Sequence, residues 1–328
     1  MPELNLVTGA TGFIGRALVR RLSEAGERVR CLVRPGGDIS RLNLPGVEFF
    51  TGDLLDPACL PGALAGAGRV WHLAALVRPP GTLVSRKKLL EQFRAINEQA
   101  PARLAEAAAG AGVRRFIHFS SIAALGPGED LGDGAEPKPL TYYGRSKLAG
   151  ELLLKTTAAT LGLDHIILRP SMIYGPGAAG WEPLFGAARR GRAAVPGNAA
   201  NTVSVCYIEN FLDAALLAAE KAPFGSAFNI SEGSLSIMDL LFTLGAALDK
   251  SPALIPLPVA LLKTVSAIFG ASLGLTGLYL PGFMGADPAR LHEACASWSH
   301  NCEGIRALGW KPAVPTARAL AISMGTRS

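Results

Sequence analysis

Tyr143 and Lys147 stand four residues apart in the stretch Tyr143-Gly144-Arg145-Ser146-Lys147. On a helix, a spacing of four puts both side chains on one face. A phenol with an ordinary pKa of about 10 is a weak base at neutral pH, but a neighbouring ammonium favours its ionised form and lowers that pKa. The pair therefore predicts a group that takes a proton from an alcohol or returns one to an alkoxide. The same spacing also occurs between a tyrosine and a lysine on an ordinary exposed helix.

Two serines, Ser120 and Ser121, directly follow the apolar run 115–119. A hydroxyl at the end of a buried strand could hydrogen-bond a substrate oxygen while Tyr143 moves the proton. A double serine alone is most often a helix cap or a turn. The combination with Tyr143 and Lys147 is what indicates a catalytic site.

Three glycines, Gly9, Gly12 and Gly15, lie between an apolar run at 4–7 and a stretch with apolar residues at helical spacing. This pattern predicts a strand, a glycine turn and a helix. The start of a helix has unpaired N–H groups and a positive dipole end, and glycines let a pyrophosphate approach them closely. The turn is thus typical of a dinucleotide site, although a glycine triplet alone is weak evidence.

Short apolar runs that read as strands alternate with helix-forming stretches such as 97–111. The predicted strands are 4–7, 29–33, 47–50, 69–73, 115–119 and 165–168. This alternation predicts an α/β fold of Rossmann type, a doubly wound parallel sheet whose ligands bind at the carboxyl ends of the strands. We expect a nucleotide-binding domain at 1–175, with 203–232 returning to it, and a smaller, mostly C-terminal substrate-binding domain at 176–202 and 233–328.

The composition excludes several classes of protein. The net charge is +6, with 32 Lys and Arg against 26 Asp and Glu, and aromatic residues are not interleaved with the basic ones, so nucleic-acid binding is not expected. The five cysteines show no metal-ligand spacing and are odd in number, and the five histidines are scattered, which indicates reduced thiols and no metal site. A predicted strand within a few residues of Met1 leaves no room for a signal peptide, so we expect a cytoplasmic protein.

Six motifs in a fixed order resemble those of the extended short-chain dehydrogenase/reductases, also called the NAD-dependent epimerase/dehydratase family. They are TGATGFIG at 8–15, GDLLD at 52–56, HLAA at 72–75, the serine pair at 120–121, YGRSK at 143–147 and LRPSMIYGPG at 168–177. The resemblance covers about the first 235 residues and returns at 308–312. One such motif is weak evidence, and six in order are strong.

The resemblance implies a role for each matching residue. Ser121, Tyr143 and Lys147 form the catalytic set, and Asn97 matches an asparagine that supports the active site. The implied cofactor-binding residues are Gly9, Thr11, Gly12, Phe13, Ile14, Gly15, Arg34, Asp53, Leu54, Leu73, Ala74, Ala75, Tyr143, Lys147, Pro170 and Met172. The sequence departs from the family pattern at Ala100-Pro101, where a Gly-Thr pair is usual, which puts the local helix geometry in doubt.

The residue after the second predicted strand bears on the choice of cofactor. An NAD-specific site usually ends this strand with an acid that accepts hydrogen bonds from the ribose hydroxyls, whereas this chain has Val33 followed by Arg34. A guanidinium can pair with a 2′-phosphate in a bidentate way. The sequence therefore favours NADP(H), with NAD(H) left open if Arg34 is only a solvated side chain.

The C-terminal half bears on the substrate. Nucleotide-sugar enzymes of this family tend to have an Arg-Asp pair before the stretch at 203–210, and neither residue is present here. The segments at 29–34, 201–210 and 214–220 instead resemble the 3β-hydroxysteroid dehydrogenase and dihydroflavonol reductase branch. The apolar segment 259–283 fits three interpretations, which are a buried helix and loop lining the substrate site, shallow membrane association, or a membrane span.

The predicted function is an NADP(H)-dependent oxidoreductase that interconverts a secondary alcohol and a ketone on an apolar steroid-, terpenoid-, flavonoid- or polyketide-like substrate. Two alternatives stay open. One is a nucleotide-sugar epimerase or dehydratase with bound NAD, and the other is a non-catalytic NADP-sensing protein, which would have no need of Ser121, Tyr143 and Lys147. A homodimer is also open.

Overall fold

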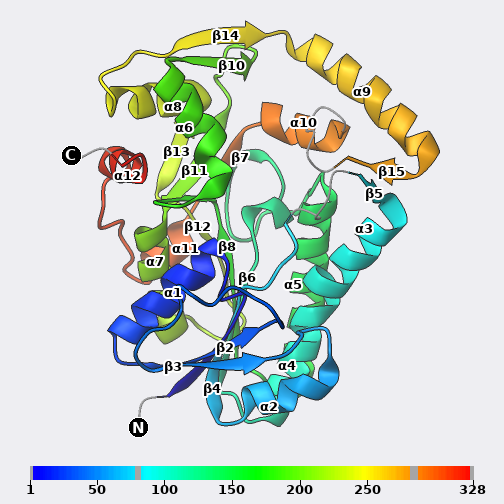
Figure 1. Ribbon diagram of the computed structural model, residues 1–328, viewed down its shortest axis with the longest axis vertical. Helices are drawn as coiled ribbons and strands as arrows, with labels where there is room; N and C mark the ends of the chain where they lie inside the picture. The colour runs from blue at the N-terminus through cyan, green and yellow to red at the C-terminus, as the bar shows by residue number, and fades with distance from the viewer. Residues whose placement is uncertain (1–2, 78–82, 281–286, 326–328) are drawn as a thin grey trace.

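The computed structural model describes residues 3–77, 83–280 and 287–325. Its centre is a seven-stranded sheet in which all neighbouring strands are parallel, in the order β12-β8-β6-β4-β1-β2-β3. The strands are β1 (Leu4–Thr8), β2 (Arg28–Val33), β3 (Val47–Thr51), β4 (Ala67–His72), β6 (Arg115–Phe119), β8 (His165–Pro170) and β12 (Ala227–Ile230). The Rossmann-type sheet predicted from the sequence is thus confirmed, and all six predicted strands are present (Figure 1).

Helices cover both faces of this sheet because successive strand residues point to opposite sides. Leu6 packs with the helices of one face, while its neighbour Val7 packs with those of the other. The first face carries α2 (Leu60–Leu64), α4 (Ala100–Gly110) and α5 (Tyr142–Leu161), and the second carries α1 (Phe13–Glu24) and α7 (Ile208–Lys221). Strands buried on both sides explain why the sequence shows short continuous apolar runs.

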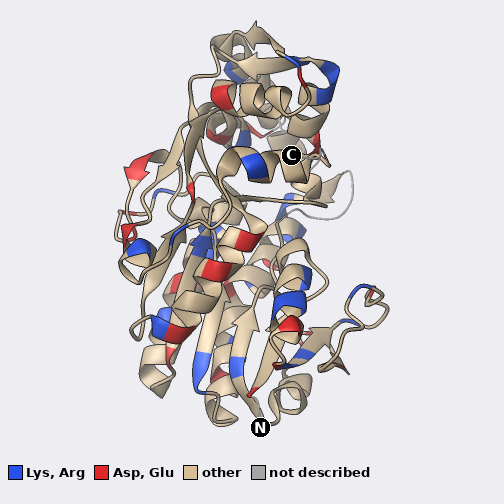
Figure 2. Cartoon of the chain, turned by 90° about the vertical axis from the view of Figure 1, so that its left-hand side faces the viewer, with Lys and Arg blue, Asp and Glu red and all other residues tan. Residues whose placement is uncertain are grey.

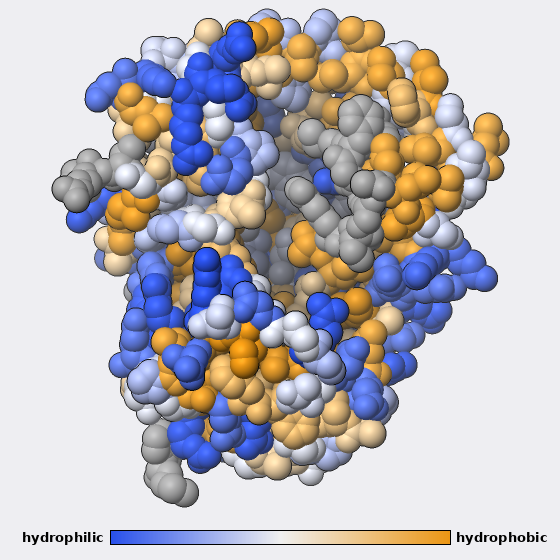
Figure 3. Space-filling model, in the orientation of Figure 1, coloured by the Kyte–Doolittle hydropathy of each residue, from blue (hydrophilic) through white to orange (hydrophobic). Residues whose placement is uncertain are grey.

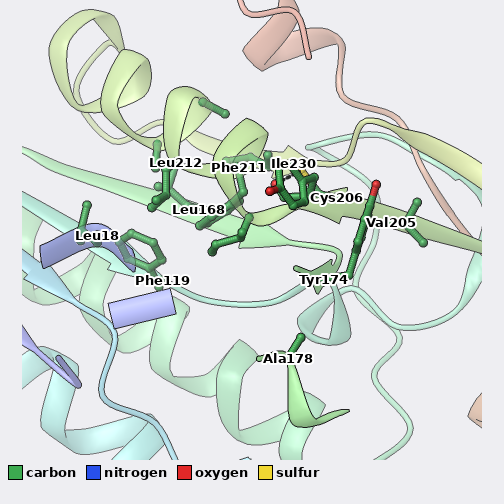
Figure 4. Close-up of a cluster of buried hydrophobic side chains, with 14 of the residues drawn as sticks. Leu18, Phe119, Leu168, Tyr174, Ala178, Val205, Cys206, Phe211, Leu212 and Ile230 are labelled. Carbon is green, nitrogen blue, oxygen red and sulfur yellow. Dashed lines mark hydrogen bonds between the residues drawn. The ribbon is translucent and has the colours of Figure 1, made fainter. Parts of the chain in front are cut away.

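The larger core lies between the sheet, α1 and α7. Figure 4 shows Leu18 of α1, Phe119 of β6 and Leu168 of β8 directed toward Phe211 and Leu212 of α7. The same cluster extends to Tyr174, Val203 and Val205, which lie outside the seven-stranded sheet. The core is therefore shared between this sheet and the elements beyond it.

On the outer side of this face, Arg21 of α1 binds Glu209 and Asp213 of α7 at 2.8 and 2.9 Å. Figure 2 views the molecule from this side, and helix segments coloured for basic residues lie close to segments coloured for acidic residues.

A second group of elements lies beyond the carboxyl ends of the main strands (Figure 1). Its five-stranded sheet contains β7 (Gly128–Leu131), β9 (Met172–Tyr174), β11 (Thr202–Tyr207), β13 (Gly233–Ser236) and β16 (Trp298–His300). Two-stranded sheets pair β10 (Arg192–Pro196) with β14 (Ala253–Leu257), and β5 (Val84–Ser85) with β15 (Leu278–Tyr279). Its helices are α6 (Glu182–Arg190), α8 (Ile237–Ala246), α9 (Val259–Thr276), α10 (Pro288–Cys295), α11 (Glu303–Ala307) and α12 (Thr316–Ser323).

The helix predicted over 97–111 has an irregular start. A π-helical turn spans Arg94–Gln99, and regular α4 begins only at Ala100 with Pro101 in its first turn. Proline has no N–H, so the bond that residue 101 would donate to the carbonyl of Asn97 cannot form. The doubt that Ala100-Pro101 raised about this helix was justified.

The buried-helix interpretation of 259–283 is wrong over its described part. Only 6% of α9 is buried, and the helix lies along the outer rim of the molecule, away from the main sheet (Figure 1). Residues 281–283 fall outside the described residues.

Candidate active site

The glycine turn joins β1 to α1, and two of its glycines leave no room for a side chain. Gly9 has a φ of +73°, and a Cβ there would lie 2.6 Å from the Ala74 nitrogen. A Cβ on Gly15 would lie 2.2 Å from the Gly9 carbonyl oxygen. The glycines therefore let the turn approach the end of β4 and let α1 pack directly on the turn.

The first turn of α1 has no side-chain cap. Gly12 is the N-cap residue, and none of the side chains that the structure describes accepts a hydrogen bond from the first N–H groups of the helix. These groups and the positive end of the helix dipole favour an anion. The turn fits the pyrophosphate of a dinucleotide.

Beside the turn lies a cavity of about 320 Å³ at the carboxyl ends of β1, β2, β3 and β4. Nine predicted cofactor residues line it, namely Gly9, Thr11, Gly12, Arg34, Asp53, Leu54, Leu73, Ala74 and Ala75. The residues that the sequence did not single out are Thr8, Leu32, Val33, Gly52, Leu55, Leu76 and Ile96. Most of these are immediate neighbours of the motifs, so strand-end position was the signal that could have found them.

The other predicted cofactor residues lie next to this cavity or farther along the sheet edge. Phe13 and Ile14 are half-buried in the first turn of α1, and Gly15 is buried under it. Pro170 ends β8 and is buried, while Met172 begins β9 and is 37% exposed.

Tyr143 lies in the first turn of α5, which Thr141 caps by accepting a hydrogen bond from the Gly144 nitrogen. The side chain of Ser121 lies close enough to the phenol of Tyr143 to affect its pKa. Ser121 also caps the short helix 122–124 by accepting from the Ala123 nitrogen at 3.1 Å. Ser120 is buried, and its hydroxyl has no hydrogen-bond partner among the described residues. Of the two serines, Ser121 is the one that meets Tyr143.

Lys147 is fully buried one turn after Tyr143 and donates from Nζ to the Phe119 carbonyl at 2.7 Å. Burial lowers the pKa of this ammonium to about 8, although the carboxylate of Glu151 opposes the shift. Glu151 in turn accepts from Arg169 Nη2 at 2.6 Å in a buried ion pair.

The pKa of Tyr143 differs from the sequence prediction. Burial raises it, and the nearby Ser121 side chain opposes the rise. The expected lowering by Lys147 is not seen, because the Lys147 ammonium is directed to the end of β6. A phenol in this state keeps its proton at neutral pH and is suited to donating it.

Asn97 lies in the π-helical turn and forms hydrogen bonds with two other segments of the chain. Its side chain accepts from the Leu76 nitrogen at 2.7 Å and donates to the Leu76 carbonyl at 2.8 Å and to Ser146 Oγ at 2.9 Å. Ser146 donates in turn to the Tyr143 carbonyl at 2.8 Å. Asn97 thus links the end of the β4 segment, which lines the cofactor cavity, to the backbone that carries Tyr143.

Residues 5–231 match the family described as the NAD dependent epimerase/dehydratase family. The chain belongs to this family. It is 30% identical over 329 residues to a ceramide reductase of Caulobacter vibrioides, a match that covers 93% of this chain and 95% of the relative. It is 28% identical over 321 residues to a UDP-glucose 4-epimerase of Vibrio cholerae, covering 95% and 92%.

Among solved structures, MoeE5 in complex with UDP-glucose and NAD superposes with a TM-score of 0.75. Its sequence is 26% identical, and the match covers 98% of this chain and 97% of that one. The family and these relatives make the chain an NAD(P)-dependent enzyme of the extended short-chain dehydrogenase/reductase type.

Two buried histidines, His72 and His118, lie close enough to Lys147 for its ammonium to affect their pKa values. The rings of His72 and His118 stack with centroids 5.3 Å apart, and both are fully buried. Burial, followed by the Lys147 ammonium, lowers the pKa of His72 to about 3, and the pKa of His118 is lowered well below its usual value by the same causes. Both rings are therefore neutral, and His72 Nδ1 hydrogen-bonds Thr8 at 2.7 Å.

Over the described ranges, no three His, Cys, Asp or Glu side chains form a group that could hold a metal ion. The five cysteines are free thiols, as predicted. The chemistry that the described residues can supply at this site is a proton from Tyr143, a hydroxyl contact from Ser121 and a buried positive charge from Lys147.

Proposed function

We propose that the protein is an NADP(H)-dependent oxidoreductase that interconverts a secondary alcohol and a ketone on an apolar substrate. The observation that carries the proposal is that Ser121 and Tyr143 lie close together at the carboxyl edge of the same sheet that forms the cofactor cavity. The nicotinamide cofactor, when bound, supplies or accepts the hydride.

Each residue of the site has a distinct role in this reaction. Tyr143, protonated at neutral pH, gives its proton to the oxygen of a ketone during reduction and takes one from an alcohol during oxidation. Ser121 orients that oxygen through its hydroxyl. Lys147 is assigned to holding the ribose of the cofactor, since its ammonium donates to the Phe119 carbonyl and does not lower the pKa of Tyr143.

The preference for NADP(H) rests on Arg34. This residue follows β2, is exposed and lines the cavity between the glycine turn and Asp53. No acid stands at the end of β2 to repel a 2′-phosphate. A guanidinium that is free to turn toward the cavity can bind the phosphate through two N–H groups.

Two observations support an apolar substrate. The Arg-Asp pair typical of nucleotide-sugar enzymes is missing before β11. In addition, the relative from Caulobacter vibrioides, which matches nearly the whole chain, is a ceramide reductase. Burial of apolar area gains about 25 cal/mol per Å² before association costs are subtracted, so such a substrate needs no diphosphate group for binding.

A nucleotide-sugar epimerase is the second candidate. It is favoured by the similarity to the Vibrio cholerae UDP-glucose 4-epimerase and to MoeE5, which was solved with UDP-glucose and NAD. Such an enzyme would oxidise and reduce the same carbon and would retain its cofactor through both steps.

Calorimetry of the NADP-loaded protein distinguishes the two candidates. A hydroxysteroid and flavonoid-like ligand set is titrated beside UDP- and dTDP-sugars, and we expect heat of binding from the apolar set alone. Micromolar binding of a sugar nucleotide with no response to the apolar set would favour the epimerase. A parallel titration of the cofactor-free protein with NADPH checks that the site is intact.

A further inference from the structure

The inner side of helix α9 holds small residues together with the half-buried Leu262 and Leu273, and large apolar residues are exposed on its outer side. Ser266 is the buried residue of the helix, and the half-buried Gly270 and Gly274 follow it at intervals of four. On the other side, four apolar residues at helical spacing point outward. They are Leu261, 59% exposed, Val265, 44%, Ile268, 62%, and Leu275, 91%.

A surface helix of a globular protein normally has the opposite arrangement, with its apolar stripe toward the core. Figure 3 shows hydrophobic side chains gathered over α9 on the upper right of the molecule, at the rim where Figure 1 places the helix. An exposed apolar patch of this kind marks a contact with a partner or a membrane. The outer face of α9 is therefore built for an apolar environment.

Basic residues border this face. The sequence 259–276 has a single charged residue, Lys263, and no acid. Arg86, Lys87 and Lys88 begin α3 (Arg86–Phe93), and the Arg86 nitrogen donates to the Gly277 carbonyl at the end of α9 at 2.9 Å. The Arg86 guanidinium lies near Gly274 on the inner side of α9, so the exposed basic residues next to the end of the helix are Lys87 and Lys88.

We propose that the outer face of α9 docks on an anionic membrane surface, with the helix lying in the plane of the interface. An apolar helix face bordered by lysine and arginine is the arrangement that binds such surfaces, and each basic residue near an anionic leaflet adds to the attraction. The proposal rests on α9 with Lys87 and Lys88, and it does not depend on the identity of the substrate.

A membrane span and a second copy of the chain fit α9 less well. Both ends of the helix are tied to the body, through β14 paired with β10 and through β15 paired with β5, and its inner face packs on α10. A span would need about 20 residues free to cross the bilayer. A dimer formed through α9 with Lys87 and Lys88 at the interface would bring like charges together, whereas an anionic lipid surface complements them.

The docked face would lie next to the catalytic helix. A groove of about 330 Å³ separates α9 from the start of α5, and Gly270 of α9, Tyr279 of β15 and Tyr142 of α5 line it. Tyr142 precedes Tyr143, and its ring meets that of Tyr279 edge-on at 6.1 Å.

Vesicle co-sedimentation tests the docking. The full chain is spun with vesicles of phosphatidylcholine alone and of phosphatidylcholine with phosphatidylserine, and we expect binding that is stronger on the anionic vesicles and weakened by salt. The double variant Ile268→Asp/Leu275→Asp should bind at least tenfold more weakly. Leu152→Asp is the matched control, because Leu152 is 56% exposed on α5, and it should bind like the wild type.

The charge contribution is tested separately with Lys87→Glu/Lys88→Glu, which should lose the preference for anionic vesicles. Circular dichroism and NADPH binding of each variant confirm that it is folded.

Three results would overturn the proposal. The first is wild-type protein that stays in the supernatant with both kinds of vesicle. The second is a dimer in sedimentation velocity that the double variant abolishes, without vesicle binding by the wild type, which would assign the face to a second copy. The third is retention of the expressed protein in membranes after alkaline carbonate extraction, which would indicate a span. None of these experiments measures turnover or ligand binding. The docking proposal can therefore be wrong while calorimetry still detects apolar ligands, so the two proposals are tested separately.

Discussion

The turn between β1 and α1 and the helix α9 both combine glycines with leucines and other apolar residues, yet they use them in opposite ways. In the first region Leu18 and Leu22 of α1 are buried against the sheet, and Gly9 and Gly15 bring backbones into close contact. In α9 the buried position is Ser266, and large apolar residues face outward. One region is organised around a ligand cavity inside the molecule, and the other presents its apolar side chains to the outside.

This difference shows that apolar content does not reveal the direction in which a helix faces. Both helices have apolar residues at intervals of three and four, but α1 has charged residues on its other face, whereas α9 is apolar nearly all round. They also differ in the neighbour that each helix meets. For α1 that neighbour is a seven-stranded sheet, whereas α9 rests on the short helix α10 and on β15.

The largest expected effect is on turnover and concerns Tyr143. Tyr143→Phe removes the group that moves the proton but leaves the glycine turn unchanged. Turnover should fall by about 10²-fold or more, the usual contribution of acid–base catalysis, while NADPH affinity changes little. Steady-state rates on an apolar ketone and fluorescence titration of NADPH measure the two effects.

Tyr142→Phe is the control for this variant, since it removes the neighbouring hydroxyl on the same helix. Its turnover should stay within a few-fold of the wild type. A Tyr143→Phe enzyme that is nearly as active as the wild type would rule out the proton-transfer role.

The second effect concerns the cofactor cavity. Arg34→Ala should lose the preference for NADPH over NADH, because one charge-assisted contact to the 2′-phosphate is worth about 1.5–3 kcal/mol, which is roughly ten- to a hundredfold in affinity. Competitive titration of both cofactors measures it. Arg41→Ala, an exposed arginine of the following loop, should keep the wild-type ratio. Wild-type protein that prefers NADH would refute the role assigned to Arg34.

The sequence predicted the strands and the cavity well because their signals are local. An apolar run followed by glycines can form few structures. Arg34 and Asp53, which follow the second and third strands, both line the cavity. The pairing of Ser121 with Tyr143 also followed, since both lie at carboxyl ends of the same parallel sheet or just beyond them.

What the sequence could not show depends on contacts between distant segments. The raised pKa of Tyr143 comes from burial and from the direction that Lys147 takes toward Phe119. The orientation of α9 depends on which of its faces α10 covers, and no periodicity encodes that choice. The neutral state of His72 and His118 comes first from burial and then from Lys147 far along the chain, and neither cause is visible in the sequence around them.

A third effect concerns the pH dependence of stability that the two buried histidines of the first region cause. The pKa values of His72 and His118 are lowered, so the unfolded chain binds protons below about pH 6.5 that the folded chain does not. Stability is therefore full above this pH and is lost as the pH falls. For His72, whose pKa is about 3, the loss of stability between pH 7 and pH 5 is about 2 kcal/mol, and His118 adds to it in the same direction. Denaturant unfolding of His118→Leu should therefore show a smaller loss of stability over this range than the wild type.

The control is His292→Leu, since the ring of His292 on α10 is exposed. Its stability should fall between pH 7 and pH 5 as steeply as that of the wild type. Equal slopes for His118→Leu and the wild type would show that His118 is protonated in the folded state.

The smallest effect compares the two regions with one substitution. Leu275 on α9 is 91% exposed, so Leu275→Ala should change the free energy of unfolding by less than about 0.5 kcal/mol. Leu18 on α1 is fully buried, and Leu18→Ala should cost about 2–5 kcal/mol through lost burial and the cavity left behind. Urea unfolding of both variants without lipid measures the difference. A cost above 1 kcal/mol for Leu275→Ala would mean that the outer face of α9 packs against protein in solution, and the contrast between the two helices would then fail.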